Sequence, residues 1–219
     1  MVSRADKPDS LLTEAQARQK AQAFLDGVAG MEAFRSLRGS AIKTVRLETL
    51  RGKAPDPFWV AYLENNSQVH VQDRDGRILR VINEGAFRKA GERRRTGVGY
   101  PAPELPVSTL QKQALIVRAR FADNANFSAM PTVRVQHARK PESQVSFQWE
   151  RQFHGIPFEG ASFSLTLDRY SGEVLVATLN NWAPQPTTKL ERVTQKEAEA
   201  MAHRAIQERF GKEPVSVQI

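Results

Sequence analysis

The stretch FQWERQFHGIPFEGASFSLTLDRYSGEVLVATLNNW, residues 147–182, decides the fold that we expect of this chain. Apolar and polar residues alternate along residues 145–153 and again along residues 162–168, with HGIP (154–157) between them. Alternation with a period of two is typical of a half-buried strand, and Gly-Ile-Pro is typical of a turn. A second turn leads to another apolar run at 173–180. The stretch predicts an antiparallel sheet and holds no obvious catalytic group.

The same order of elements occurs earlier in the chain. A helical pattern precedes both predicted sheets, and each sheet contains an acid-to-glycine turn followed by a last strand. The interval is 95 residues from Thr13 to Ser108 and 96 residues from Gly76 to Gly172, although the turn that ends at Gly76 looks one residue shorter. A repeated order with a nearly constant interval indicates an internal duplication. The expected strands are residues 41–48, 58–64, 69–73 and 77–83 in the first copy and residues 132–137, 145–153, 162–168 and 173–180 in the second.

Three segments carry the start signals of helices. Thr13 with Gln16, and Thr194 with Glu197, have the spacing of a capping box, and a Ser-Thr pair at 108–109 can cap the middle helix. Apolar residues then recur at three- and four-residue steps, which predicts one buried face on each helix. These residues are Ala17, Ala21, Phe24, Leu25 and Val28, then Leu110, Ala114, Val117 and Phe121, and finally Ala198, Ala202, Ile206 and Phe210.

We therefore expect an α+β fold made of tandem two-layer units, in each of which one helix packs on a four-stranded antiparallel sheet. The first unit is residues 10–84 and the second is residues 107–184. Residues 85–106 between them combine Gly, Pro and basic residues, which predicts a linker. Residues 190–219 would begin a third, incomplete unit. Either the sequence is part of a longer protein, or its last helix packs on the second unit.

The composition excludes several classes of site. The 219 residues include no cysteine, which removes disulfides, thiolate metal sites and a cysteine nucleophile. No apolar run approaches the ~20 residues that cross a bilayer. The N-terminus, MVSRADKPDSLL, lacks the apolar region of a signal peptide. Either the protein is cytoplasmic, or a leader or anchor lies outside this sequence.

The residues that could perform chemistry are scattered along the chain. No histidine stands in a His-Glu-x-x-His motif, so we expect no metal and no cofactor, and we expect solvated side chains for His70 and His154. Neither a nucleophile elbow nor a phosphate-binding loop is present. The aspartates of the two turns, Asp73, Asp75 and Asp168, are expected to satisfy backbone amides. Three tryptophans are expected to pack in the core or on the sheet, Trp59, Trp149 and Trp182, and the alternative for Trp182 is to anchor a neighbouring repeat. The sequence predicts that the protein is not an enzyme.

The chain carries a formal net charge of +8, from 32 basic and 24 acidic residues. Basic residues concentrate at 35–53 and at 88–95. Such clusters attract polyanions, so one alternative function is binding of an anionic envelope polymer through the first cluster and through Arg93, Arg94 and Arg95. Aromatic residues do not interleave with the basic runs as a platform for single-stranded nucleic acid requires, which disfavours nucleic acid. The other interpretation is a solubilising face with a flexible basic linker.

Several of these motifs also resemble a known family. The helix openings LTEAQA and VTQKEAEAMA, with the sheet ending LDRYSGEVLVA, resemble the PepSY superfamily. The hairpin WERQFHGIPFEGASFSLTLDRYSGEV is similar to the propeptide hairpin of thermolysin-type metalloproteases, and the tandem copies are similar to the YcdB/YcdC-type repeats of bacterial envelope proteins. The resemblance implies non-catalytic domains outside the cytoplasm that act as propeptides, inhibitors or modulators of peptidases. It assigns no catalytic residue.

These expectations combine into one functional prediction. The chain would be an extracytoplasmic binding module, secreted or anchored in the envelope, whose sheet is the working part. A partner polypeptide, such as a peptidase, would pair with an open edge strand or lie on the uncovered face. The hairpin tip around His154, Ile156 and Phe158 would contact this partner. A structural spacer in a larger surface protein is the remaining alternative.

Overall fold

The computed structural model describes residues 11–49, 57–96, 103–121, 127–137, 143–153 and 156–180, together with residues 196, 197, 200 and 204. Within these ranges the side chains of residues 94–96, 136, 137, 143, 153 and 156–160 are not described. The chain forms two compact units, Met1–Ala183 and Pro184–Ile219. The described residues of the second unit are helical, and the predicted third repeat at 190–219 otherwise lies outside the described residues.

The first unit alternates helices with groups of strands. Its opening helix begins as the sequence predicts, because Thr13 and Gln16 form a capping box with hydrogen bonds of 2.8 and 3.2 Å. The elements in chain order are α1 (Glu14–Val28), the 3-10 helix η1 (Glu32–Leu37), β1 (Ile42–Glu48), β2 (Phe58–Leu63), β3 (Gln68–Gln72), β4 (Ile78–Ile82), α2 (Glu84–Thr96), α3 (Val107–Phe121), β5 (Thr132–His137), β6 (Ser143–Phe153), β7 (Ile156–Asp168) and β8 (Val174–Asn180).

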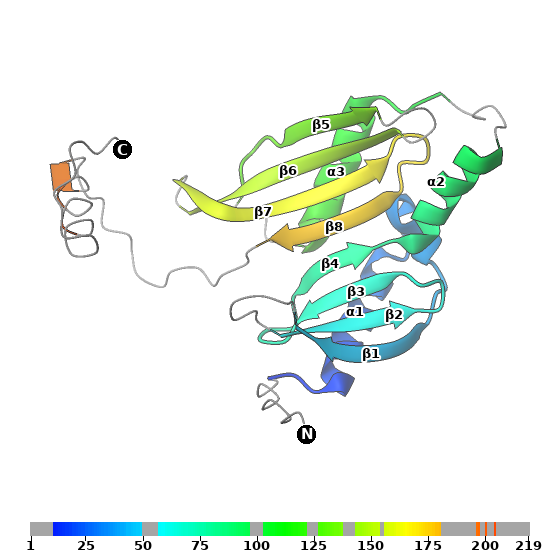
Figure 1. Cartoon of the computed structure of the whole chain (residues 1–219), viewed down its shortest axis with the longest axis horizontal. Helices are drawn as coiled ribbons and strands as arrows, with labels where there is room; N and C mark the ends of the chain where they lie inside the picture. Colours follow the sequence, from blue (N-terminus) through cyan, green and yellow to red (C-terminus); the bar gives the residue numbers. More distant parts are fainter. Residues whose placement is uncertain are drawn as a thin grey trace, which may run out of the picture. The chain divides into compact units, whose positions relative to one another are not determined.

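All eight strands belong to one antiparallel sheet, in the order β1-β2-β3-β4-β8-β7-β6-β5 (Figure 1). The predicted mixture of helices and antiparallel sheet is confirmed. The sheet is continuous, however, because β4 pairs with β8 through Arg80–Thr178, Val81–Ala177 and Ile82–Val176. An unpaired edge exposes backbone donors and acceptors, and the β4–β8 pairing satisfies two such edges at once. Among the strands that the structure describes, β1 and β5 lie at the two edges.

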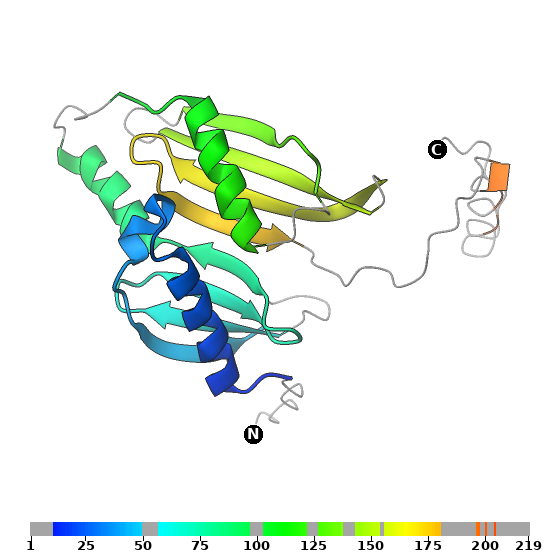
Figure 2. The same cartoon turned by 180° about the vertical axis from the view of Figure 1, so that it is seen from behind.

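The two long helices cover the same face of the sheet (Figure 2). Helix α1 packs on β1 to β4, and α3 packs on β6 and β7. The core lies between these layers, and the rings of Phe24 in α1 and Phe121 in α3 meet at 5.2 Å. Trp59 and Trp149 belong to this core, as the sequence predicts, and Trp182 lies outside the described residues. We call the side of the sheet opposite α1 and α3 the open face.

The pairing of the strands recurs along the chain. In the β3–β4 hairpin, Gln68 pairs with Ile82 and Val69 with Val81, and the residues 96 positions later make the same pairs in the β7–β8 hairpin. The turns also match, because the amide of Gly76 donates to Gln72 at 3.0 Å and that of Gly172 to Asp168 at 2.8 Å. Both glycines have a φ of +72°. The expectation of a shorter first turn was wrong: Gln72, not Asp73, occupies the place of Asp168.

Helix α2 lies where the sequence predicts a linker, at the start of residues 85–106. The side chain of Asn83 accepts a 3.2 Å hydrogen bond from the amide of Ala86, which caps the helix. Ala86 and Ala90, four residues apart, are buried, and the helix contacts β8 and η1. Gly85 and Gly91 look like linker residues in the sequence, but here they fall within a helix that closes one end of the sheet (Figure 1).

Candidate functional site

The two edges of the sheet differ in how they are protected. At β1 the pairing with β2 is interrupted by a bulge between Ile42 and Thr44. Arg18 of α1 reaches this edge and donates a 3.1 Å hydrogen bond to the carbonyl of Ile42. The exposed side chains of Lys43 and Arg46 add charge along the strand. Bulges and charged side chains are features that hinder the pairing of an edge with another chain.

Strand β5 also carries an exposed charge, Arg134, but in the described part of the chain it has no bulge. Its six residues pair with β6 without a register shift. Val133 and Val135 are 38% and 37% exposed, although their partners Phe147 and Val145 are fully buried in the core. The two valines therefore point to the helix-covered face at a place where that layer ends. They continue the core outward and remain partly exposed.

The opposite edge shows what a covered valine looks like. The row of paired residues that runs outward from β3 through β2 ends at Thr44 in β1. The equivalent row that runs outward from β7 through β6 ends at Thr132 in β5. Val45 in β1 thus occupies the place of Val133 in β5, yet only 5% of Val45 is exposed. Contiguous exposed apolar surface marks an interaction site more often than scattered surface residues do. The β5 edge, defined as Thr132 to Val135 with its outer backbone, is our candidate site.

Other exposed apolar residues lie in the same half of the molecule. Of the large apolar side chains that are exposed in the described residues, only Leu11 belongs to the first half. The remainder are Leu115 and Ile116 of α3, Met130 just before β5, and the two valines of β5. The sequence alone gives no sign of this asymmetry, because both edge strands read as short alternating runs.

The predicted hairpin tip is only partly within the described residues. His154 lies outside them. Ile156 and Phe158 belong by their backbone to β7, where Ile156 pairs with Phe153 at the end of the β6–β7 hairpin, but their side chains are not described. The structure brings the hairpin and β5 into one sheet, and the role of the tip stays a prediction.

Arg93 of the predicted polyanion site is already engaged. Its guanidinium donates to the buried carboxylate of Asp168 at 2.5 Å and lies 5.6 Å from the ring centre of Tyr170. Arg94 and Arg95 follow it in α2, and their side chains are not described. In the other basic cluster, Arg35 and Arg38 both form ion pairs with Glu32. Of the basic residues that suggested a polymer site, Arg93 is therefore bound to a buried carboxylate, whereas Arg35 and Arg38 share the exposed carboxylate of Glu32.

A buried carboxylate that the sequence analysis missed joins the two halves. Glu173, at the start of β8, accepts hydrogen bonds from Ser36 and from Arg35 of η1, and Lys89 of α2 lies at 3.7 Å. Burial alone would raise the pKa of Glu173. The hydrogen bonds from Ser36 and Arg35 and the charges of Lys89 and Arg35 outweigh that effect and hold the pKa below its usual value. The Glu173 site has a structural role, because the residues that contact its carboxylate are Ser36, Arg35 and Lys89 of η1 and α2.

His70 on the open face is mostly buried, so the expectation of a solvated imidazole was wrong. Its ring stacks on Phe58 at 5.3 Å, and Nε2 lies 3.1 Å from Oε1 of Gln68. Burial, with a smaller contribution from the charge of Arg80, lowers the pKa of His70 to about 4. The imidazole is therefore neutral at physiological pH.

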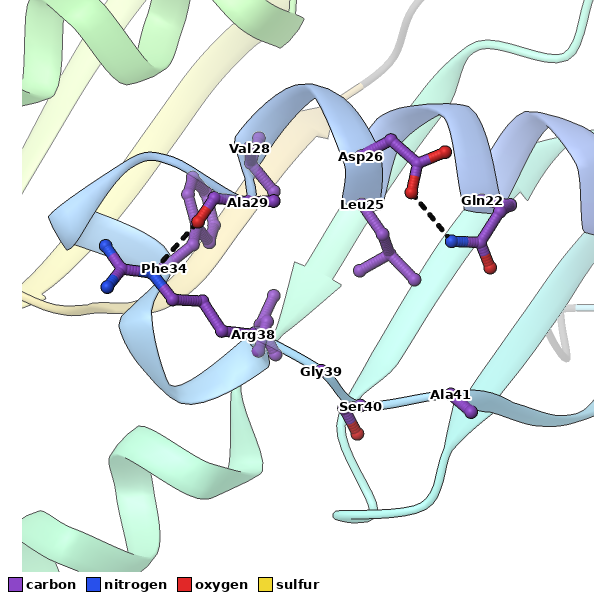
Figure 3. A pocket seen from close by; sticks show the side chains of 11 residues that line it. Gln22, Leu25, Asp26, Val28, Ala29, Phe34, Arg38, Gly39, Ser40 and Ala41 are labelled. Carbon is purple, nitrogen blue, oxygen red and sulfur yellow. Dashed lines mark hydrogen bonds between the residues drawn. The ribbon is translucent and has the colours of Figure 1, made fainter.

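One pocket of about 280 Å³ lies beside the C-terminal end of α1 (Figure 3). Its polar groups are occupied: Asp26 accepts from Gln22 at 2.8 Å, and Arg38 donates to the carbonyl of Ala29 at 2.9 Å. The apolar part of its lining is Leu25, Val28, Phe34 and Leu37. The lining of this pocket is therefore mixed, and its Asp26 and Arg38 are hydrogen-bonded to other groups and not to each other.

Within the described ranges, no three His, Cys, Asp or Glu side chains are grouped so that they could hold a metal ion. None of the described helices is both long enough and apolar enough to span a membrane.

Comparisons of the chain with models of known protein families, with curated proteins and with solved structures gave no match. The resemblance to the PepSY superfamily stays a prediction from the sequence.

Proposed function

We propose that this protein is a non-catalytic binding module that takes up an extended polypeptide as an additional strand beside β5. The single observation that carries the proposal is the exposure of Val133 and Val135 on a regular terminal strand. In this mode of recognition, backbone hydrogen bonds supply affinity and alternate side chains supply specificity. Location in the cell envelope, and a peptidase as the partner, are parts of the proposal that come from the resemblance to PepSY and propeptide domains.

The physical gain from an added strand has two parts. The outer amides and carbonyls of β5 would exchange water for the partner's backbone. Each such hydrogen bond contributes about 1 kcal/mol net. The partner would also cover Val133 and Val135, about a third of which remains exposed. Completing their burial would add roughly 0.5–1 kcal/mol for each valine. Several modest contributions of this kind support reversible binding.

We also infer that the two halves of the sheet are copies of one unit, in which a helix packs on four strands. The repeated pairs of the β3–β4 and β7–β8 hairpins support this. So do the buried positions of the long helices, which fall 93 residues apart: Ala17, Ala21, Phe24, Leu25 and Val28 in α1, and Leu110, Ala114, Val117, Arg118 and Phe121 in α3. On this interpretation the first copy keeps its edge closed, and the second copy is adapted for binding.

The proposal is tested by measuring binding to extended peptides before and after the edge is altered. The double variant V133K/V135K places two charges where an added strand must bury its apolar residues. We expect it to lose binding to immobilised alternating Thr-Val peptides and to lose any inhibition of envelope metalloproteases. The matched control is I116K, which changes an exposed apolar residue of α3 outside the strand.

Circular dichroism and the urea midpoint should show that both variants stay folded, because all three positions are exposed. Unchanged binding by V133K/V135K, or an equal loss in I116K, would remove the proposal. Binding that disappears between low and physiological salt, and that depends on Arg94 and Arg95 but not on the valines, would favour the anionic polymer instead.

A further inference from the structure

We propose, on the basis of the proposed function, that the polypeptide bound by β5 carries a carboxylate between two apolar side chains. The proposal follows from the alternation of β5 itself. Val133 and Val135 point to the helix-covered face, so Arg134 between them points to the open face. An incoming strand presents its side chains with the same alternation. The residue opposite Arg134 therefore shares the open face with it, and its two neighbours lie beside the valines.

Arg134 is an exposed cation whose neighbours within the sheet are neutral. Directly across from it on β6 is Ser146, and Ser146 is paired with Thr166 on β7 through a 3.0 Å contact between their hydroxyl groups. The diagonal neighbours on the same face of β6 are Gln144 and Gln148. In the described part of the chain, Arg134 forms no ion pair. Because Ser146 faces Arg134 on β6, a carboxylate can lie directly opposite Arg134 only on the outer side of β5, where an added strand would lie.

The corresponding cation at the other edge already has compensation. Arg46 in β1 is equivalent to Arg134 in β5. Each lies two residues after a threonine, and these threonines, Thr44 and Thr132, end equivalent rows of paired residues. The guanidinium of Arg46 lies 6.0 Å from the ring centre of Tyr62, and the hydroxyl of Tyr62 donates to Glu48 on the same strand. Arg46 is therefore the matched control for Arg134: the same charge, at an equivalent position, with partners in its own sheet.

A second copy of β5 is a poorer occupant than an acidic strand. Its sequence, TVRVQH, contains no carboxylate, and antiparallel self-pairing would bring a second guanidinium to the same edge. Like charges directly opposite each other destabilise a pair of strands, whereas opposite charges stabilise it. Charge complementarity therefore selects an apolar–acidic–apolar segment of a different chain.

The experiment compares three immobilised Thr-Val alternating peptides that differ at one central position, which is Glu, Gln or Lys. We expect the wild-type protein to bind the Glu peptide up to about fivefold more tightly than the Gln peptide and to bind the Lys peptide most weakly. The R134E variant should reverse this order, and R46E should preserve it. The preference should weaken as salt is added, because the pair is exposed.

The outcomes separate this inference from the proposed function. If V133K/V135K abolishes binding but the three peptides bind equally to wild type, the β5 edge binds peptide without recognising the carboxylate of the peptide. If R46E, and not R134E, reverses the order, the wrong edge has been assigned. If no peptide binds at all, the proposed function itself fails. If sedimentation shows a dimer that V133K/V135K dissociates, the occupant is a second copy and the inference is overturned.

Discussion

The carboxylate of Glu173 accepts a 2.8 Å hydrogen bond from the backbone amide of Ser36, 137 residues earlier in the chain. This contact ties η1 to the start of β8, and the charges of Arg35 and Lys89 complete the site. Glu173 is only 1% exposed. The carboxylate itself is therefore buried, whereas the side chains of Arg35 and Lys89 that approach it remain partly exposed.

We expect Glu173→Gln to lower the free energy of unfolding by about 2 kcal/mol, because the hydrogen bonds to a charged group are lost and two cations lose their partner. The control is Glu32→Gln, which removes an exposed carboxylate that pairs with Arg35 and Arg38 and should cost less than about 1 kcal/mol. Urea unfolding measures both. Equal losses would show that Glu173 is no more than a surface ion pair.

The same carboxylate predicts a fall in stability in acid. The folded pKa of Glu173 lies below its usual value of 4.5. Its contribution is therefore present above that pH and is lost as the pH falls through the lower folded pKa. Glu173→Gln should flatten this part of the curve of unfolding free energy against pH. A variant curve parallel to wild type below pH 4.5 would contradict the assignment.

His70 predicts a second effect at higher pH. The unfolded chain takes up the proton of this imidazole near pH 6.5, and the folded chain takes it up only near pH 4. The free energy of unfolding should therefore decrease as the pH falls from about 6.5 to about 4, by at most about 3 kcal/mol, and should level off at lower pH. NMR titration of the imidazole gives the folded pKa directly, and His70→Gln should remove the slope. A His70 titration midpoint near 6.5 would contradict the burial argument.

The matching turns predict that alanine at either positive-φ glycine is costly. At Gly172 an added Cβ would lie 2.9 Å from Oε1 of Gln113, and at Gly76 it would lie 2.9 Å from the side chain of Lys20. We expect Gly172→Ala and Gly76→Ala each to destabilise the fold by about 1–2 kcal/mol. The control is Gly27→Ala in α1, where a Cβ meets nothing within 4 Å and a gain of about 0.5–1 kcal/mol is expected. Thermal unfolding distinguishes the three.

The cap of α2 predicts a difference between two substitutions of Asn83. Its Oδ1 accepts from Ala86, whereas its Nδ2 has no hydrogen-bond partner among the described residues. Asn83→Ala should cost about 1 kcal/mol, and Asn83→Ser should cost less, because serine keeps the acceptor and removes the unsatisfied donor. Urea midpoints provide the comparison. A serine variant as unstable as the alanine variant would argue against capping.

Local signals in the sequence predicted much of the fold. The capping box of Thr13 and Gln16, the alternation along β6 and β7, and the burial of Trp59 and Trp149 are all confirmed. Each of these depends on residues close together in the chain, where periodicity and turn chemistry act directly. The predicted copies and the resemblance to PepSY domains stay predictions.

The features that escaped the sequence analysis are long-range. The sequences of β4 and β8 do not indicate that these strands pair with each other, because order along the chain does not determine order across a sheet. Gly85 and Gly91 lie within α2 and made its sequence resemble a linker, whereas the helix is stabilised by packing against η1 and β8. The asymmetry between the covered Val45 and the exposed Val133 arises from tertiary packing alone. The candidate site therefore became visible only in three dimensions.

The β4–β8 ladder has a consequence for how such a molecule can be assembled. Its three pairs are centred on Val81 and Ala177, and residue 80 pairs with 178 just as residue 82 pairs with 176. Under our proposal that the two halves are copies of one unit, the 96-residue interval makes this the isologous pattern of a two-fold dimer within one polypeptide. Covalent linkage would then give the two proposed copies a permanent high local concentration, so that three pairs would suffice where separate molecules would need a larger contact.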